Sequence, residues 1–299
     1  MCMFSLPVSQ VANTRIFARL TGQGTQLLAY QMEYMSRTEN AMILPLPVRQ
    51  PAEEGSLRFI DFEKYDNFFD DLITGFPYIQ RIGIGCSDVA PLTSESLDVV
   101  KVGNYIASFV PTLADFSRLD ERFRLSPETW DKLPQYQDFS FAVFKLADGT
   151  LRPHPMAMEF QTASDAIFFP TVHVHDGETH PTERFDHMLY LQHAGLDSVV
   201  DAYRGDAHVD ATTGLVRSQE NASQFCRIDQ TAGLVDGNLL VHRRDLRGEH
   251  PNQDTIIAVV GHPTQKTFNF KSLWSYVPWV IFLSAMGWLF ARRSKLKAA

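Results

Sequence analysis

Six of the ten histidines in the chain lie between positions 154 and 193, and their centre is the run Thr171-Val-His-Val-His-Asp-Gly-Glu-Thr-His180. In an extended strand, residues two positions apart share a face, so His173 and His175 are expected to project to the same side. Two neutral imidazoles on one face suit a divalent transition metal such as Zn, Fe, Mn or Cu. Further ligands would come from the nearby residues His180, His187 and Glu178. The run therefore predicts a metal-binding protein or a metal-dependent enzyme, with a metal-bound water as the nucleophile.

The same run also fits a strand that binds nothing. In that interpretation Thr171, His173 and His175 form a polar face that meets water, which is the commoner setting for histidine. Residues 181–194 bear on the choice. If they form a helix that Gly195 ends, His180, Glu183 and His187 share one face, whereas a strand through 185–192 would break that grouping.

Cys2 is a second candidate nucleophile. Removal of Met1 would leave an N-terminal thiol whose own amine acts as the base, as in N-terminal-nucleophile hydrolases. An ordinary cysteine is the favoured interpretation, and Cys86 and Cys226 are expected to pack as small apolar residues. The chain has no P-loop, G-x-S-x-G, H-E-x-x-H or kinase motif. A binding or interaction protein is therefore the leading hypothesis, ahead of the metal-dependent alternative.

The 19 residues from Leu273 to Ala291 contain no Asp, Glu, Lys, Arg or His. About 20 apolar residues span the hydrocarbon core of a bilayer, so this stretch predicts one transmembrane helix. Interfacial aromatic and basic side chains are expected at its ends, namely Trp274, Trp279, Trp288, Arg292 and Arg293. The bilayer is therefore an expected partner, and another protein is a second one.

Two rules disagree on which side of the membrane the body faces. The basic tail 292–299 would face the cytoplasm by the positive-inside rule, which leaves the body outside. The N-terminus, however, has no basic and apolar signal region. A tail-anchored protein with its body in the cytoplasm is slightly favoured.

The composition excludes a disulfide-dense scaffold and a nucleic-acid-binding protein. With three cysteines in 299 residues the chain is not a disulfide-dense scaffold. The net charge is −8 overall, and −12 without residues 273–299 and their four basic side chains. Nucleic acid is therefore not an expected partner, because binding to phosphates needs a basic surface.

The rest of the chain predicts one β-rich α+β domain over residues 1–272, an antiparallel sheet or sandwich with a few packed helices. A hairpin is expected over 14–34, and a second hairpin is expected around Asp148-Gly149. Because of Pro45 and Pro47, the apolar run 41–48 is expected at a sheet edge or at the end of a strand. Helices are expected near 65–72 and over 112–130. Residues 202–224 and 243–254 are expected to be surface loops, and 255–260 the last strand.

Several runs form a set that also occurs together elsewhere: Leu44-Pro-Leu-Pro47, Val102-Gly-Asn-Tyr105, Phe139-Ser-Phe-Ala-Val-Phe-Lys-Leu146, Glu159-Phe160 and Phe169-Pro170. On these runs the chain resembles an uncharacterised bacterial domain-of-unknown-function family of membrane-anchored proteins. The resemblance covers residues 10–175 and rests on structural motifs. It implies a membrane-held domain and no particular activity. Members of such a family usually carry a signal peptide, and this chain departs from them there.

Overall fold

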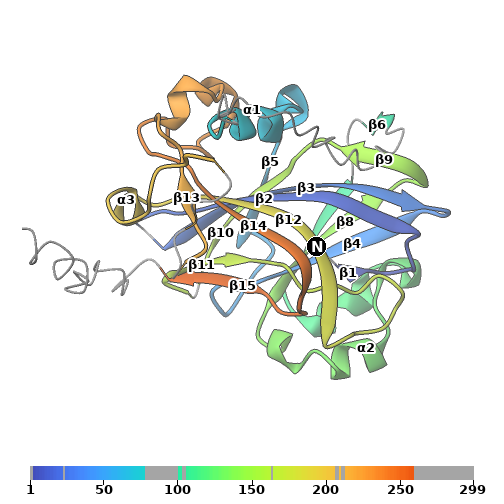
Figure 1. Ribbon diagram of the computed structural model, residues 1–299. Helices are drawn as coiled ribbons and strands as arrows, with labels where there is room; N and C mark the ends of the chain where they lie inside the picture. The colour runs from blue at the N-terminus through green and yellow to red at the C-terminus, as the bar shows by residue number, and fades with distance from the viewer. Residues whose placement is uncertain are drawn as a thin grey trace, which may run out of the picture. The chain divides into compact units, whose positions relative to one another are not determined.

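Strands predominate in the described part of this chain, as the sequence predicted, and the helices described there are few and short (Figure 1). The computed structural model describes residues 3–22, 24–77, 100–102, 106–162, 164–205, 209 and 213–258. The described residues belong to one compact unit, Met1–Gly261. Cys2, Cys86 and all of 259–299, including the predicted span and its flanking Trp and Arg residues, lie outside the described residues. No helix in the described ranges combines the length and hydropathy that crossing a membrane requires.

The largest sheet has nine strands and mixes antiparallel with parallel pairs. Its main path contains, in spatial order, β13 (Val216–Arg217), β14 (His242–Pro251), β12 (Thr182–Gln192), β2 (Gln10–Leu20), β3 (Thr25–Ser36), β10 (Met156–Gln161) and β5 (Leu57–Ile60). Off this path, β9 (Gly149–Pro153) pairs with β3, and β6 (Val100–Val102) pairs with β9. Only two of these pairs are parallel: β12 with β2, and β6 with β9.

Two smaller sheets complete the described strands. One is antiparallel throughout and contains β1 (Met3–Phe4), β4 (Asn40–Leu46), β8 (Ser140–Leu146) and β7 (Ile106–Val110), in that order. The other is the antiparallel pair of β11 (Ala166–Phe169) and β15 (Thr255–Ala258). The last described strand therefore falls where the sequence predicted it.

The first predicted hairpin is confirmed. β2 and β3 pair from Gln10↔Met35 to Leu20↔Gln26, with a register shift between Ala12 and Arg15. Asn13 lies within that irregularity with φ 50°, a left-handed conformation that asparagine tolerates better than most residues. Its backbone N–H donates to Asp186 Oδ2 on β12 at 3.2 Å. The irregularity thus fixes β2 to the neighbouring strand.

One strand prediction holds in part and a second was wrong. β4 is not an edge strand, because it lies between β1 and β8, but it ends at Leu46 beside the prolines, which was the other predicted alternative. Pro45 is accommodated there since β1 covers only Met42 and Ile43, so the missing amide hydrogen of Pro45 faces no partner strand on that side. Asp148-Gly149 does not close a hairpin either: β8 pairs with β4 and β7, whereas β9 pairs with β3 and β6. The chain changes sheets at this turn.

The charged segment 243–254 was predicted to be a loop, but most of it is β14. Its partner β12 places opposite charges across the pair, in the registers Arg184↔Glu249 and Asp186↔Arg247. Opposite charges facing each other across strands stabilise an exposed sheet face. A single sequence does not reveal this pairing, because the complementary residues lie some 60 positions away.

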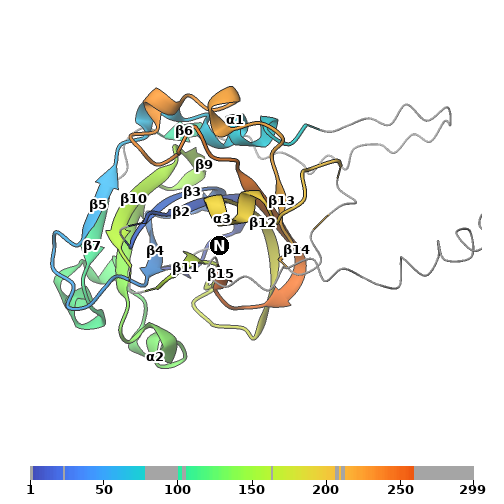
Figure 2. The same ribbon diagram turned by 90° about the vertical axis from the view of Figure 1, so that its left-hand side faces the viewer.

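The helices are short. The α-helices are α1 (Phe68–Thr74), α2 (Pro127–Asp131) and α3 (Ala194–Asp197), and the 3₁₀ turns are η1 (Glu63–Tyr65), η2 (Leu113–Arg118), η3 (Glu121–Phe123), η4 (Pro134–Tyr136), η5 (Ala222–Gln224) and η6 (Ile228–Gln230). The helix predicted near 65–72 is confirmed as η1 and α1. The long helix predicted over 112–130 is wrong, since Leu119 and Arg124 have extended backbone and divide it into η2, η3 and α2. In Figure 1 and Figure 2, α1 and α2 lie on opposite sides of the strands.

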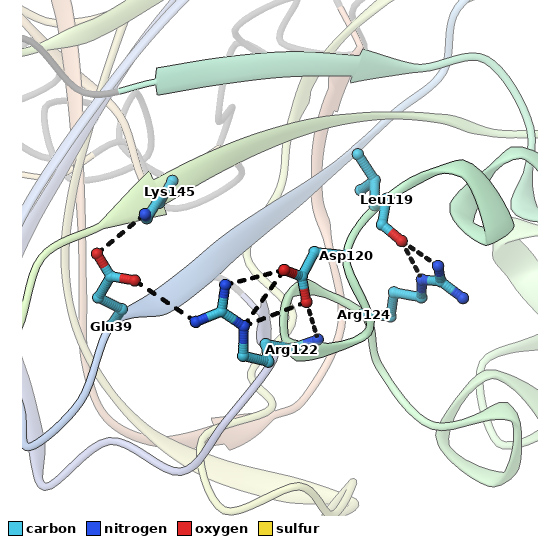
Figure 3. A network of polar contacts seen from close by, with 6 residues as sticks. All are labelled: Glu39, Leu119, Asp120, Arg122, Arg124 and Lys145. Carbon is cyan, nitrogen blue, oxygen red and sulfur yellow. Dashed lines mark hydrogen bonds and ion pairs between the residues drawn. The ribbon is translucent and has the colours of Figure 1, made fainter.

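Polar side chains hold these turns in place (Figure 3). Arg122 forms ion pairs with Asp120 at 2.8 Å and Glu39 at 3.7 Å, and Lys145 of β8 reaches the same Glu39 at 2.9 Å. Arg124 donates to the carbonyl oxygen of Leu119. Ion pairs thus connect the interrupted segment 113–131 to the small antiparallel sheet. Its apolar residues pack against the core from several short turns and not from one continuous helix.

Aromatic side chains anchor α1 to the largest sheet. Phe68 and Phe69 are fully buried and Phe76 is nearly so. Phe68 packs edge-on against Phe17 of β2, with ring centres 5.7 Å apart. Cys226 is buried in the same cluster, as predicted for a packing residue.

Candidate functional site

The histidine-bearing run leaves β11 as an extended segment, residues 170–175, that belongs to no named strand. Val174 makes a single parallel bridge to Met3. Thr171 and His173 are fully buried, although the alternative interpretation placed them on a face that meets water. That interpretation was wrong, because β1 and residues 252–254 cover the segment from two sides.

The structure brings together three of the predicted imidazoles. The ring centres of His173 and His175 are 5.0 Å apart, and those of His173 and His187 are 5.2 Å apart. Phe185 packs on His173 with ring centres 4.2 Å apart. We call His173, His175 and His187 the histidine cluster.

His187 reaches the cluster because residues 182–192 form a strand, β12, which is one of the two alternatives that the sequence left open. In a strand, Glu183, Phe185 and His187 alternate onto one face, and Phe185 and His187 are buried there. Glu183 Oε2 lies 3.9 Å from His173 Nδ1, and its side chain is 21% exposed. The expectation that a strand would separate Glu183 from His187 was therefore wrong, since residues four apart share a face in a strand as well.

His180 and Glu178 are not part of the cluster. They lie in the exposed turn before β12, where His180 Nε2 is 3.0 Å from Asp176 Oδ2 and Glu178 forms an ion pair with Lys132 of the α2 C-terminal cap. The hydrogen bond that His180 donates to the Asp176 carboxylate raises the pKa of His180, whose ring is exposed. Of the five predicted ligands, the fold thus assembles three and adds Glu183.

Side chains of the 252–254 turn hold the segment in place. Asn252 Oδ1 accepts from the His173 N–H at 2.7 Å, and Asn252 Nδ2 donates to the His173 carbonyl at 3.0 Å. Asp254 Oδ1 accepts from the N–H groups of Thr171 at 2.8 Å and Val172 at 3.2 Å. Asp254 Oδ2 accepts from the Tyr136 hydroxyl at 2.6 Å. These side chains replace the partner strand that the segment lacks.

Sequence reasoning missed Asn252 and Asp254 because the run Pro251-Asn-Gln-Asp254 has the composition of a surface turn. The one signal was its position directly before the last strand, which must pair with β11. Only that pairing brings the turn beside His173.

The N-terminal residues cover the other side of the segment. The Phe4 N–H donates to the Val174 carbonyl at 3.0 Å, and the Val8 N–H donates to the His175 carbonyl at 2.9 Å. The Phe4 ring packs edge-on against His175, with ring centres 5.9 Å apart. Met3 and Phe4 are fully buried. The cluster is therefore enclosed by residues from both ends of the described chain.

Burial keeps the clustered imidazoles uncharged. Desolvation lowers the pKa of His173 and of His187 well below the usual value, and it lowers the pKa of His175 to about 4. At pH 7 each ring therefore carries one nitrogen lone pair and one N–H. Desolvation also raises the pKa of Glu183 and sets that of Asp254 at about 6. Neither ring nitrogen of His173, nor Nε2 of His175, has a hydrogen-bond partner among the described residues.

The conformation shown is not that of a formed metal site. Within the described ranges, no three His, Cys, Asp or Glu side chains are arranged to hold a metal ion. What the fold supplies is a set of closely packed neutral imidazoles with one carboxylate at their margin.

A separate small cavity of about 170 Å³ opens beside β13 and β14. Its lining combines aromatic, small and charged residues: Tyr203, Gly205, Val209, Gly214, Val216, Arg243 and Asp245. The Arg243 guanidinium lies 5.0 Å from the ring centres of both Phe76 and Tyr203 and pairs with Asp245 at 3.1 Å. A charged group held between two aromatic rings gives this cavity a rigid polar wall.

Comparisons with known proteins find a low similarity to solved structures of baculovirus P35. No family model matches the chain, and no curated protein matches it. Among solved structures, baculovirus P35 shares 14% identity over 86% of this chain and 99% of that chain, with a TM-score of 0.46. P35 in a complex with caspase-8 shares 12% identity over 82% of this chain and 95% of that chain, with a TM-score of 0.43. The chain is thus similar to P35 at a level that assigns it neither a family nor a function.

Proposed function

We propose that this chain is a single-pass membrane-anchored protein whose β-rich body binds a partner at the membrane surface. The observation that carries the proposal is the stretch from Leu273 to Ala291, which has no charged residue or histidine. Trp274, Trp279 and Trp288 lie toward its ends, where aromatic rings favour the interface. Four basic residues follow within 292–299, and basic residues rarely lie inside a bilayer.

The cytoplasmic placement of the body is part of the proposal. It is supported by the buried free thiol of Cys226. Free cysteines are usual in a reducing compartment. The acidic charge of the body would keep most of its surface away from anionic lipid, so we expect partners to approach a surface that is not pressed onto the membrane.

The size of the cavity beside β14 supports a binding role. Pockets for small-molecule substrates usually enclose about 300–1,000 Å³. The cavity of about 170 Å³ at Tyr203 and Arg243 is closer to the size of one side chain. We therefore propose a protein partner that inserts a side chain there, with the bilayer as the second partner.

Alkaline carbonate extraction tests the anchor. Full-length chain expressed in cells is expected to stay in the membrane pellet at high pH, and a matched chain ending at residue 272 is expected in the supernatant. A third variant with Leu283→Arg and Phe290→Arg keeps the length but places charges within the apolar stretch. Release of the full-length chain together with the truncated one would refute the membrane anchor.

The proposed binding of a protein partner is tested with a defined probe. Caspase-8, which is in a complex with P35 in one of the solved structures, is the first soluble protein to test as a probe. A Tyr203→Ala variant compared with wild type reports whether any binding observed uses the cavity beside β14. An unchanged affinity in that variant would exclude the cavity as the contact.

A further inference from the structure

The histidine cluster and Glu183 lie together from two separate parts of the chain, the segment 170–175 and strand β12. We propose that His173, His175, His187 and Glu183 bind one divalent transition-metal ion of the zinc class. This inference is independent of the membrane anchor, because every proposed ligand lies within the β-rich body.

The spacing of the rings is the first argument. Two imidazoles on one tetrahedral zinc have their ring centres about 5 Å apart, because each Zn–N bond is about 2.0–2.1 Å and the ring centre lies about 1.1 Å beyond the nitrogen. The measured separations are 5.0 Å for His173 and His175 and 5.2 Å for His173 and His187. His173 thus lies at metal-sharing distance from both other rings.

The orientation of the rings is what changes on binding. His173 and His175 are nearly parallel, with an interplanar angle of 25°, whereas His173 and His187 meet at 67°. Turning an imidazole about its Cβ–Cγ bond redirects its nitrogens while the ring centre moves little. The proposed site therefore requires the imidazoles to turn from their packed arrangement before their nitrogens converge on one ion.

The chemistry of the donors is the second argument. His173 is fully buried, and both of its ring nitrogens lack a hydrogen-bond partner among the described residues. An unsatisfied buried polar group is unfavourable, and a metal ion satisfies the lone pair of a neutral imidazole. Nitrogen donors in this number favour zinc, copper, iron or nickel over calcium or magnesium, which prefer oxygen.

Glu183 supplies the negative charge that a buried dication needs. Its Oε2 is 3.9 Å from His173 Nδ1, and its side chain keeps 21% exposure. A carboxylate at the margin of the site gives the metal both a fourth ligand and a route of entry from solvent. Three imidazoles and one carboxylate complete a tetrahedral set.

Titration of the purified full-length chain with Co²⁺ in detergent tests the proposal. One Co²⁺ per chain is expected, with the visible absorption of a tetrahedral site, and zinc is expected to displace it. Glu183→Gln is expected to weaken binding at least about tenfold, and His187→Gln more than that. Elemental analysis after dialysis measures the stoichiometry independently.

The matched control is His180→Gln. His180 is an exposed histidine of the turn before β12 that contacts Asp176, and its loss is expected to leave the affinity unchanged. Because Glu183 lies at the margin, Glu183→Gln keeps the test decisive if His187→Gln does not fold. Absence of stoichiometric Co²⁺ from the wild-type chain, or equal affinity in wild type and Glu183→Gln, would overturn the site.

Discussion

Replacing Asn252 with alanine is expected to destabilise the body by roughly 2–4 kcal/mol. The Asn252 side chain makes two hydrogen bonds, at 2.7 and 3.0 Å, to the backbone N–H and carbonyl of His173. His173 is fully buried, so both groups lose their partner without gaining a protein replacement. Each orphaned buried group costs about 1–3 kcal/mol, and we take the lower part of that range because Asn252 itself is half-buried and admits some water.

A chain ending at Gly261 suits the measurement, because residues up to Gly261 form one compact unit. Trp130 is the only tryptophan it retains. Trp130 packs against Phe116 and Phe141, so its fluorescence reports unfolding of the small sheet and the turns beside it. At about 2–4 °C per kcal/mol for a body of this size, the midpoint of thermal unfolding is expected to fall by roughly 4–16 °C.

Asn238→Ala is the matched control, since Asn238 is an exposed asparagine in a turn. Asn252→Asp separates the two hydrogen bonds, because it keeps an acceptor for the His173 N–H and removes the donor to the carbonyl. A free energy of unfolding for Asn252→Ala within 0.5 kcal/mol of wild type, a margin typical of uninvolved surface positions, would refute the claim that this side chain replaces a partner strand.

Three further changes probe other parts of the fold. Desolvation lowers the pKa of His242 to about 4, so below about pH 6.5 the unfolded chain takes up a proton that the folded chain does not. Through this residue the free energy of unfolding should fall by about 1.4 kcal/mol per pH unit from pH 6.5 to 4. In urea unfolding, His242→Gln should show a smaller dependence of this free energy on pH than wild type. Gly75→Ala places a Cβ 2.6 Å from the Phe225 ring and should cost about 1–3 kcal/mol, whereas Gly55→Ala, with nothing within 4 Å, should be near neutral in the same assay. His173→Leu should raise the free energy of unfolding by about 1–3 kcal/mol, because it replaces a buried polar ring with an apolar side chain of similar volume. The same change should abolish Co²⁺ binding. A loss of stability would show that the ring has a structural partner.

Local patterns predicted local structure well. The β2–β3 hairpin follows from two apolar runs separated by a glycine-containing turn, and α1 follows from aromatic residues at helical spacing before Gly75. The contact between His173 and His175 followed from strand alternation alone. In each case the interacting residues lie within one or two elements of each other along the chain.

Features that depend on distant residues could not be predicted in this way. Pro45 is compatible with an interior strand only because β1 is two residues long, which no property of residues 41–48 reveals. The charged run in β14 is a strand because β12 presents opposite charges across from it. His187 and Glu183 reach His173 only because β12 is extended, and the sequence left helix and strand open for residues 181–194.

The position of the histidine cluster in the fold bears on what it does. At position 173, an apolar side chain would give the folded protein a lower free energy than an imidazole whose two nitrogens lack hydrogen-bond partners among the described residues. The chain instead fixes the backbone of this residue from both directions, with Asn252 on one side and the bridge from Met3 to Val174 on the other. A backbone held this firmly fits a site in which ring orientation, not chain movement, separates the empty from the loaded state. Metal binding should therefore change the near-ultraviolet circular dichroism of Phe185 and Phe4, which pack on the rings, while the far-ultraviolet spectrum stays constant.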